Sequence, residues 1–445
     1  MFLPKFFYGW KIVAAGIGIA TMASTFFVYG FSAFFIPWRN EFGWSRGLLG
    51  GVVGLSRLEG GLVAPISGYL VDKYGPRKIM YFGVGLMGIG FILLRWVQSL
   101  SALYLVFLLF LAMGSSFGTG RPLQVAVANW FIKKRGRAMG FLMSGYGLGG
   151  SIVFIFAMLI DNLGWKTATV IAGLCMWGIG FPLISILRHK PEQMGLLPDG
   201  AQVNKTNDTI SKFEKKNMNF PKPPAHFWNK DSREELELNV WQALRTRAFW
   251  MLAIVYAIFS GVPGITTVHL APFLAEELGL EYVVAVGALS LFVFTSVGGR
   301  ILFGIVADYV NLQILVALLF CVLSFSIFLF STISNLSQIP LYVCAFGLAY
   351  GGVIPLRAVI QGYFFGRKSF GTIGGLLQFV DLPATVAAPI WIGFLADSLP
   401  GGYRIGFKAI AFIIIFAAIA VLFARCPQEP LPNDKPPKFI AKFFK

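Results

Sequence analysis

Six charged side chains lie well inside long apolar segments of this 445-residue chain, where a formal charge is costly. Four are arginines and two are acids: Arg57, Glu59, Arg121, Arg300, Arg357 and Asp381. Placing an arginine at the centre of a membrane-spanning helix costs about 2.5–3.5 kcal/mol, so such residues usually pair with an acid or face a water-filled cavity. Four cations against two acids predict an electropositive interior, which favours anionic ligands over cations and neutral sugars.

Two ion pairs are one interpretation of this set. At 1.5 Å per helical residue, Glu59 and Arg121 lie about 18–20 Å from a charged end of their segments, and Arg357 and Asp381 lie about 15–20 Å from theirs. Each pair belongs to one half of the chain, so each could form a structural salt bridge. The alternative is that Arg121 and Arg357, which are 236 positions apart, both line a cavity and contact a ligand. The sequence leaves both interpretations open.

Arg57 and Arg300 have no obvious acidic partner. Arg57 lies 15 residues before Asp72 and Arg300 lies 8 residues before Asp308, and the difference of seven residues is close to two helical turns, so both point to nearly the same face. Glu59 points elsewhere, about 200° round the helix from Arg57. An unpaired arginine facing a cavity is a fixed anion receptor, because its planar fork matches a carboxylate and stays charged.

The composition is that of a polytopic membrane protein. Hydrophobic residues make up 56% of the chain and charged residues only 13%, and residues 12–38 contain no acidic or basic side chain. A helix needs about 20 apolar residues to cross a bilayer. The sequence therefore predicts an all-α polytopic protein with twelve transmembrane helices, near residues 11–37, 46–71, 77–97, 101–131, 137–160, 165–187, 248–274, 282–307, 311–332, 339–364, 370–396 and 403–424.

The net charge of +17 follows from topology. With alternate loops assigned to opposite sides, 27 Lys and Arg residues fall on the side of both termini and six on the other side. The positive-inside rule then places both termini in the cytoplasm of a multi-pass cell-membrane protein, and lipid headgroups rather than nucleic acid are the expected basic-patch partners. No metal-ligand spacing, HExxH, GxSxG or P-loop motif occurs, so we expect no cofactor, no metal and no enzyme activity.

The chain divides into two related halves. "GYLVDKYG" and "GIVADYVN" carry Asp72 and Asp308, and "MLIDNLGWK" and "FLADSLPGGYR" carry Asp161 and Asp397; both pairs are 236 positions apart. This shared offset indicates duplication of a six-helix unit. The expected organisation is a six-helix bundle, a polar cytoplasmic linker ending in a short amphipathic helix, a second six-helix bundle and a cytoplasmic tail, over residues 1–187, 188–247, 248–424 and 425–445.

The stretch "GYLVDKYGPRK" resembles the loop 2–3 motif of the major facilitator superfamily. The resemblance implies the major facilitator fold, with two pseudo-symmetric six-helix bundles, and it implies that this loop controls the exchange between inward-open and outward-open states. The matching residues, which the resemblance assigns to gating, are Gly68, Asp72, Gly75, Arg77 and Lys78.

A narrower resemblance is to monocarboxylate and oxalate/formate-type transporters. "NWFIKKRGRAMGFLMSGYG" is similar to their motif between helices 4 and 5, and "VHLAPFLAEELGL" is similar to a helix 7 segment of prokaryotic members. The resemblance implies that Arg300 matches the helix 8 arginine that binds the substrate carboxylate, and that His269 matches the helix 7 histidine. Animal members carry an aspartate one turn before that arginine, where this chain has Ser296.

These observations predict a secondary active transporter of small organic anions, acting by alternating access, with proton-coupled symport as the expected mode. The alternative is a pH-independent exchanger of larger or dicarboxylate anions. Organic anion, protons and membrane lipids are the expected partners of a monomer. Candidate substrate-binding residues are Arg300, Arg57, His269, Tyr146, Arg121 and Arg357, and candidate proton carriers are Asp381, Glu59, His269 and either Glu276 or Glu277.

Overall fold

The computed structural model describes residues 7–201 and 236–427, and within these ranges all regular structure is helical. The first bundle contains α1 (Tyr8–Ala23), a π-helical turn (Ser24–Val28), α2 (Gly30–Phe42), α3 (Arg46–Tyr74), α4 (Pro76–Leu94), α5 (Leu100–Val106), a second π-helical turn (Phe107–Ala112), α6 (Met113–Gly118), α7 (Gly120–Trp130), α8 (Arg135–Leu163), α9 (Trp165–Gly178) and α10 (Gly180–Ile186). The second bundle contains α13 (Arg247–Leu278), α14 (Tyr282–Val306), α15 (Leu312–Phe330), α16 (Gln338–Phe365), α17 (Phe370–Ser398) and α18 (Gly402–Phe423).

The helices agree with a membrane-spanning architecture. Eleven helical segments of the described chain are long and apolar enough to cross a bilayer, and α13 begins with a further apolar stretch, Arg247–Pro263. Each of the twelve predicted segments corresponds to a helix or to helices in series. The all-helical fold prediction is therefore confirmed.

The predicted helix over residues 101–131 is broken at Thr119, which has φ −132° and ψ −92°. Helix α7 starts immediately after the break, so Pro122 occupies its first turn, where a missing N–H leaves no hydrogen bond unmade. The break also places Arg121 at the beginning of a helix rather than in the middle of one. In a continuous helix, the Arg121 side chain would point in a different direction.

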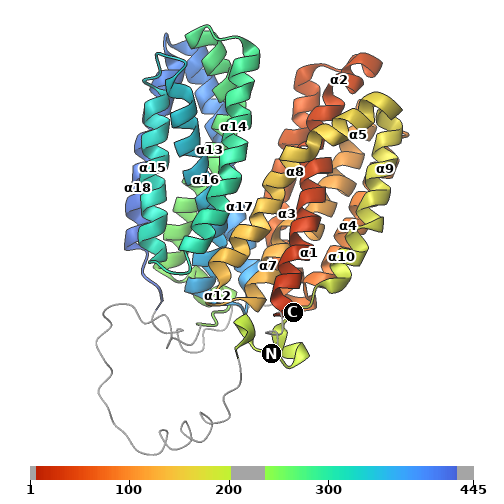
Figure 1. Cartoon of the computed structure of the whole chain (residues 1–445), viewed down its shortest axis with the longest axis vertical. Helices are drawn as coiled ribbons and strands as arrows, with labels where there is room; N and C mark the ends of the chain where they lie inside the picture. Colours follow the sequence, from red (N-terminus) through yellow and green to blue (C-terminus); the bar gives the residue numbers. More distant parts are fainter. Residues whose placement is uncertain (1–6, 202–235, 428–445) are drawn as a thin grey trace, which may run out of the picture.

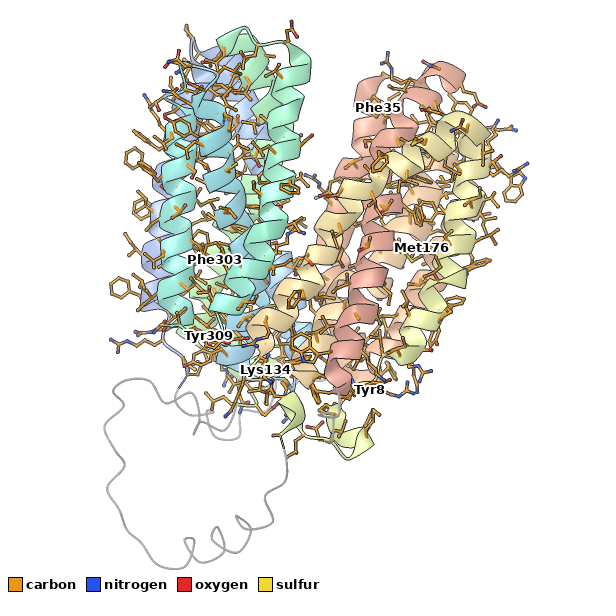
Figure 2. All side chains as sticks on the ribbon, viewed as in Figure 1. Tyr8, Phe35, Lys134, Met176, Phe303 and Tyr309 are labelled. Atoms are coloured by element: carbon orange, nitrogen blue, oxygen red, sulfur yellow. The ribbon has the colours of Figure 1, made fainter. Side chains whose placement is uncertain are left out.

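The two bundles meet near one end of the molecule and diverge toward the other, as the ribbons in Figure 1 show. We call the first end the linker end, because residues 201 and 236 border the segment between the bundles there. The opposite end is called the open end. Figure 2 shows Lys134 of one bundle and Tyr309 of the other close to the linker end.

Part of the predicted linker, residues 188–247, packs against the bundles. Residues 202–235 lie outside the described residues, as do residues 428–445 of the predicted tail. The Asp199 carboxylate accepts hydrogen bonds from the backbone N–H groups of Ile132, Lys133 and Lys134, 2.8–3.0 Å away. The first residues of the predicted linker are therefore held against the first bundle. Before α13, a five-residue helix, α12 (Val240–Leu244), begins with a capping box.

Two aspartates join the bundles at the linker end in equivalent ways. Asp72, on α3, accepts hydrogen bonds from the N–H groups of Gly371 and Thr372, 2.9 Å and 2.7 Å away, in the first turn of α17. Asp308, just after α14, accepts from the N–H of Gly136 at 2.8 Å and from the N–H of Arg137, in the first turn of α8. We call these contacts the cross-bundle caps. They satisfy unpaired helix N–H groups and place negative charge at the positive end of each helix dipole.

Glycines allow both cross-bundle caps. A Cβ on Gly371 would lie 2.6 Å from the carbonyl oxygen of Gly68, and a Cβ on Gly304 would lie 2.8 Å from the carbonyl oxygen of Gly136. Gly68 and Gly304 are 236 positions apart, which matches the internal repeat. The Asp308 cap has an additional ion pair, with Arg137 Nε 2.6 Å from Asp308 Oδ2. Burial raises the pKa of the Asp308 carboxyl, and its hydrogen bonds with Arg137 and Gly136 offset only part of that rise.

Asp72→Asn is expected to shift the protein toward states in which the linker end is separated. A carboxylate at a helix N-terminus contributes about 1 kcal/mol, so its loss should raise the separated population by about fivefold. Distances between spin labels on Lys78 and on the exposed Val310, after replacement of the native cysteines, would report this population. Asp161→Asn, at an exposed aspartate, is the control. An unchanged distance distribution in Asp72→Asn would contradict the proposed role of the cap.

Candidate functional site

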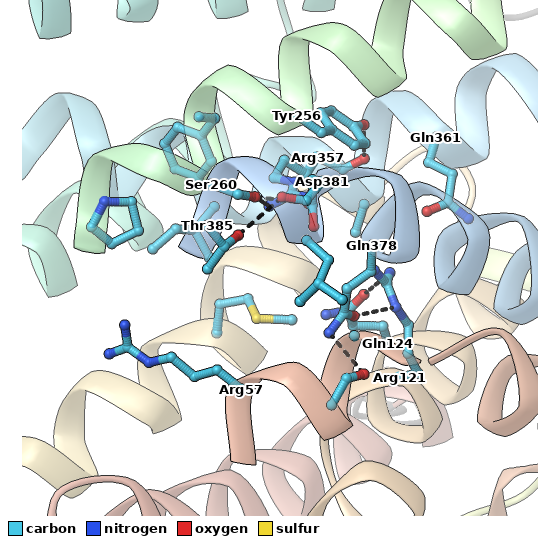
Figure 3. Close-up of a pocket in the computed structure, with 18 of the residues that line it drawn as sticks. Arg57, Arg121, Gln124, Tyr256, Ser260, Arg357, Gln361, Gln378, Asp381 and Thr385 are labelled. Carbon is cyan, nitrogen blue, oxygen red and sulfur yellow. Dashed lines mark hydrogen bonds and ion pairs between the residues drawn. The ribbon is translucent and has the colours of Figure 1, made fainter. Parts of the chain in front are cut away.

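A cavity of about 520 Å³ lies between the bundles, with walls from α3, α7 and α8 on one side and α13, α16 and α17 on the other. Figure 3 shows its polar side chains. Four of the lining residues are charged, namely Arg57, Arg121, Arg357 and Asp381. With three guanidinium groups and one carboxylate, the lining carries two net positive charges.

Arg357 and Asp381 form an ion pair in the second bundle. Arg357 Nη2 lies 2.6 Å from Asp381 Oδ2, and the Ser260 hydroxyl donates to the same oxygen at 2.7 Å. The guanidinium also sits over the Tyr256 ring, 4.4 Å from its centroid. Asp381 is buried, with 4% of its surface exposed, and α13, α16 and α17 each contribute to this cluster. The predicted pairing of Arg357 with Asp381 is confirmed, and both residues still line the cavity.

Arg121 joins the two bundles through amide groups. Its Nε donates to Gln378 Oε1, 3.2 Å away on α17, and its Nη1 donates to Gln124 Oε1 at 3.0 Å. Gly374 leaves room for the guanidinium, because a Cβ there would lie 2.6 Å from Arg121 Nη1. The predicted Glu59–Arg121 ion pair is wrong. Glu59 instead accepts from the Ser116 hydroxyl at 3.3 Å, and its Oε1 is buried without a hydrogen-bond partner among the described residues.

Arg57 is the most accessible cation of the cavity. Its side chain is exposed, and no hydrogen bond or ion pair joins it to another described residue. In Figure 3 it lies apart from Arg121 and from the Arg357–Asp381 pair. Its positive charge is therefore available to an anion that enters the cavity.

Arg300 is placed behind the cavity wall and does not line the cavity. It is only 7% exposed, and its Nη1 donates to the carbonyl oxygen of Met143, 2.8 Å away on α8 of the other bundle. As expected, no carboxylate pairs with Arg300 among the described residues, but a backbone carbonyl, which the sequence could not indicate, accepts from its Nη1. Its Nε has no hydrogen-bond partner in the described part of the chain. Two of its neighbours line the cavity: Met143, which accepts its hydrogen bond, and Tyr350, which is close enough for an electrostatic interaction. Its contact with substrate stays a prediction.

Two more of the predicted binding residues, His269 and Tyr146, also lie outside the cavity lining, whereas Arg57, Arg121 and Arg357 line it. His269 is buried, with Nε2 2.8 Å from the carbonyl oxygen of Pro389 on α17 and its ring centroid 5.8 Å from that of Tyr403. Tyr146 lies on α8, close enough to Arg300 for an electrostatic interaction. Their roles in binding are not tested by this arrangement.

Glu276 and Glu277 are the two acids that follow His269 and were predicted as alternative proton carriers. Glu277 forms an ion pair with Arg404, with 2.8 Å between Oε2 and Nε. The side chain of Glu276 lies outside the described residues.

Several polar lining residues escaped the sequence analysis because they carry no charge. Gln124, Gln361 and Gln378 bring amide groups into the cavity, and Ser260 and Tyr256 support the ion pair. Gln361 and Gln378 occur on the same helices as Arg357 and Asp381, one turn further on and one turn before respectively. Polar residues one helical turn from a buried charge share its helix face, and this spacing could have identified Gln361 and Gln378 as lining residues.

The cavity lining presents uncompensated positive charge and contains a hydrogen bond that joins the two bundles. Arg57 offers an unpaired fork, Arg121 is held by neutral amides that leave its charge uncompensated, and Arg357 is neutralised by Asp381. In the described part of the chain, no group of His, Cys, Asp and Glu is arranged to hold a metal ion.

Comparisons with known proteins agree with this architecture. A family model described as Major Facilitator Superfamily matches residues 17–382. Mouse monocarboxylate transporter 12 is 25% identical over 451 residues, covering 97% of this chain and 90% of its own. The oxalate:formate antiporter of Oxalobacter formigenes is 26% identical over 348 residues, covering 76% and 73%.

A solved structure extends the likeness to the fold. The human organic anion transporter MFSD10 superposes with a TM-score of 0.67 at 14% identity, covering 94% of this chain and all of that chain. At this identity the likeness concerns the fold alone. Because the family model spans most of both bundles, the chain belongs to the Major Facilitator Superfamily and is a multi-pass membrane transporter rather than an enzyme.

Proposed function

We propose that this protein transports small organic anions that carry a carboxylate, by alternating access of the cavity between its two bundles. The observation that carries the proposal is the charge of the cavity lining, with three arginines and one aspartate. A carboxylate entering the cavity would meet Arg57 first and Arg121 next, and each fork can form two charge-assisted hydrogen bonds. The printed names of two relatives, a monocarboxylate transporter and an oxalate:formate antiporter, support the same substrate class.

The proposed working state follows from the cross-bundle caps. With the caps formed, the linker end is joined and the cavity would be reached from the open end. Separation of the caps and approach of the bundles at the open end would expose the cavity at the linker end. We place both termini in the cytoplasm of a cell membrane, as the distribution of Lys and Arg indicates, so the described state would be outward-facing. A monomer contains all parts that this cycle requires.

Asp381 is the proposed carrier for proton-coupled symport. It is the one acidic residue of the cavity lining, and its carboxylate is already shared between Arg357 and Ser260. An anion that draws Arg357 away would leave Asp381 buried without its counter-charge, which favours protonation. Substrate and proton would then bind interdependently.

The second candidate function is an exchange of dicarboxylates that does not depend on pH. The separation of Arg57 from the Arg121 amide cluster favours it, since each cation could hold one carboxylate of a larger anion. Uptake of labelled lactate or oxalate into proteoliposomes distinguishes the modes. Symport would respond to an imposed pH gradient, and exchange would require internal anion but no gradient.

Arg57→Gln is expected to lower kcat/KM for carboxylate uptake by about tenfold to a hundredfold, because a hydrogen bond to a charged group contributes about 1.5–3 kcal/mol. Arg57→Lys should recover part of this loss, since it keeps the charge without the fork. Arg39→Gln, at an exposed arginine outside the cavity, is the matched control. Normal carboxylate uptake by Arg57→Gln would overturn the proposed role of this residue.

Arg300→Ala separates two roles of the buried arginine. If Arg300 contacts substrate during the cycle, Arg300→Ala should abolish carboxylate uptake and Arg300→Lys should restore little. If it only stabilises the described state through Met143, both variants should instead alter the label distances at the linker end while a bound carboxylate still protects the protein from thermal unfolding.

A further inference from the structure

An apolar groove runs along the membrane-facing seam between the bundles, beside the cavity. Its volume is about 650 Å³, and all of its lining residues are apolar. Leu58 of α3 forms one wall, and residues of α17 form the other, among them Leu382, Ile390, Trp391 and Phe394. Ile390 and Phe394 are each 67% exposed, and Trp391 is 40% exposed.

The groove and the cavity share a wall. Leu382 lines both, and it packs against the other bundle at Gly61, where a Cβ would lie 2.6 Å from Leu382 Cδ1. Arg57, the exposed cation of the cavity, directly precedes Leu58 of the groove in the sequence. The unpaired cation of the cavity and the apolar lining of the groove are thus neighbours on α3, and Leu382 borders both spaces.

We propose that the groove binds the alkyl chain of an amphipathic monocarboxylate whose carboxylate is held by Arg57. This inference rests on the proposed function and extends its substrate class from small carboxylates to medium-chain ones. The charge of Arg57 complements the carboxylate, and the apolar groove complements the chain. A chain leaving the cavity past Leu382 is shielded from the cavity's polar groups.

The distance along α17 from Leu382 sets the chain length that reaches Trp391, which lies three residues before Phe394, the last lining residue of the groove. Trp391 is nine residues after Leu382 on the same helix, which is about 13 Å at 1.5 Å per residue. An extended alkyl chain advances about 1.3 Å per carbon, given carbon–carbon bonds of about 1.5 Å. A chain of about ten carbons therefore reaches from Leu382 to Trp391. Shorter acids would leave the groove partly empty.

Quenching of Trp391 fluorescence tests the proposal directly. The protein is placed in nanodiscs of unlabelled phospholipid and titrated with 12-bromododecanoate, and the Trp391 signal is taken as the difference between the wild type and Trp391→Phe. We expect saturable quenching whose midpoint rises at least tenfold in Arg57→Gln. Equal midpoints in the two proteins, or no saturation, would overturn the proposal.

A second titration separates the substrate chain from bilayer lipid. Nanodiscs that contain phospholipid brominated on its acyl chains are compared for the wild type and Arg57→Gln. If the groove holds a bilayer phospholipid, that lipid quenches Trp391 strongly in both proteins and 12-bromododecanoate cannot reduce the quenching, and the proposal fails. Relief of lipid quenching by unbrominated dodecanoate in the wild type, but not in Arg57→Gln, supports it.

Chain-length competition gives an independent readout with a matched pair of variants. Butyrate, octanoate and decanoate are used to displace 12-bromododecanoate from Ala387→Phe, which narrows the groove, and from Ala14→Phe, at an exposed alanine elsewhere. Each methylene transferred from water favours binding by roughly fourfold. Decanoate should therefore lose its advantage over butyrate in Ala387→Phe and keep it in Ala14→Phe. The same advantage in both variants would contradict the proposal.

Different results would contradict the proposed function and the proposed role of the groove. If lactate and butyrate are neither bound nor transported, the proposed function is wrong. If they are transported through Arg57 but quenching by the long-chain acid is independent of Arg57, only the groove assignment is wrong.

Discussion

Asp381→Asn is expected to abolish transport and to destabilise the protein by about 3 kcal/mol. The substitution leaves the Arg357 guanidinium without the carboxylate that lies 2.6 Å from it, in a position where its side chain is only 23% exposed. Breaking a buried ion pair from one side costs about 3–5 kcal/mol, because the remaining charge is left unpaired. We expect a destabilisation at the lower end of this range, because Arg357 borders a cavity that water can enter.

Thermal unfolding of the purified protein measures this effect, and a companion variant identifies its cause. Arg357→Gln/Asp381→Asn removes both charges, so its Tm should return toward that of the wild type while transport stays absent. Asp397→Asn, at an exposed aspartate later on α17, should leave Tm unchanged. If the double variant is as unstable as Asp381→Asn, an unpaired Arg357 is not the cause.

Gly68→Leu is expected to prevent the linker end from closing and to stop transport. Gly68 and Gly371 approach through their backbones, with 2.6 Å between a Cβ placed on Gly371 and the Gly68 carbonyl oxygen. A leucine side chain at position 68 would overlap the backbone of α17 itself, which cannot move aside as a side chain can. The bundles would have to separate at this end, and the cap formed by Asp72 would be lost.

The spin-label pair on Lys78 and Val310 reports this change as a shift of nearly the whole population to longer distances. Gly50→Leu is the matched control, because a Cβ on Gly50 of the same helix meets no atom within 4 Å. Gly68→Leu with a wild-type distance distribution and active transport would show that the close approach is dispensable.

The fold was largely predictable because its signals are local. Runs of about 20 apolar residues define the helices, and the shared offset of 236 positions indicates the repeat. Gly68 and Gly304 begin the two aligned stretches, but their significance depends on which backbone lies opposite, and only the structure shows that. The break at Thr119 was also missed, although Gly118 and Gly120 flank it and Pro122 follows, and these residues are its local signal.

The site was predictable in its residue types but not in its pairings. Arg357 and Asp381 were expected to pair because they lie at similar depth on neighbouring helices, and they do. Depth gave the same expectation for Glu59 and Arg121, and it was wrong, because rotation about the helix axis directs Arg121 toward Gln378 of the other bundle. Depth follows from counting residues, whereas the direction of a side chain depends on how two helices pack.

Arg300 illustrates the same limit. Counting acids correctly indicated that no carboxylate would pair with it among the described residues, but a backbone carbonyl leaves no mark in a sequence. The Met143 carbonyl oxygen accepts its hydrogen bond from across the bundle interface. A main-chain acceptor therefore replaces the side-chain partner that the sequence analysis looked for.

The two cross-bundle caps are alike in position but unequal in strength. Among the described residues, the donors to Asp72 are neutral, including the Thr372 hydroxyl at 2.7 Å, whereas Asp308 also holds the charged Arg137 at 2.6 Å. Arg137 in turn donates to the Tyr309 hydroxyl. A bond between two charged groups is roughly twice as strong as a neutral one. The α3–α17 seam should therefore part first while the α8–α14 seam still holds, so that the bundles turn about an off-centre hinge and the first passage to the linker end forms on one flank of the molecule.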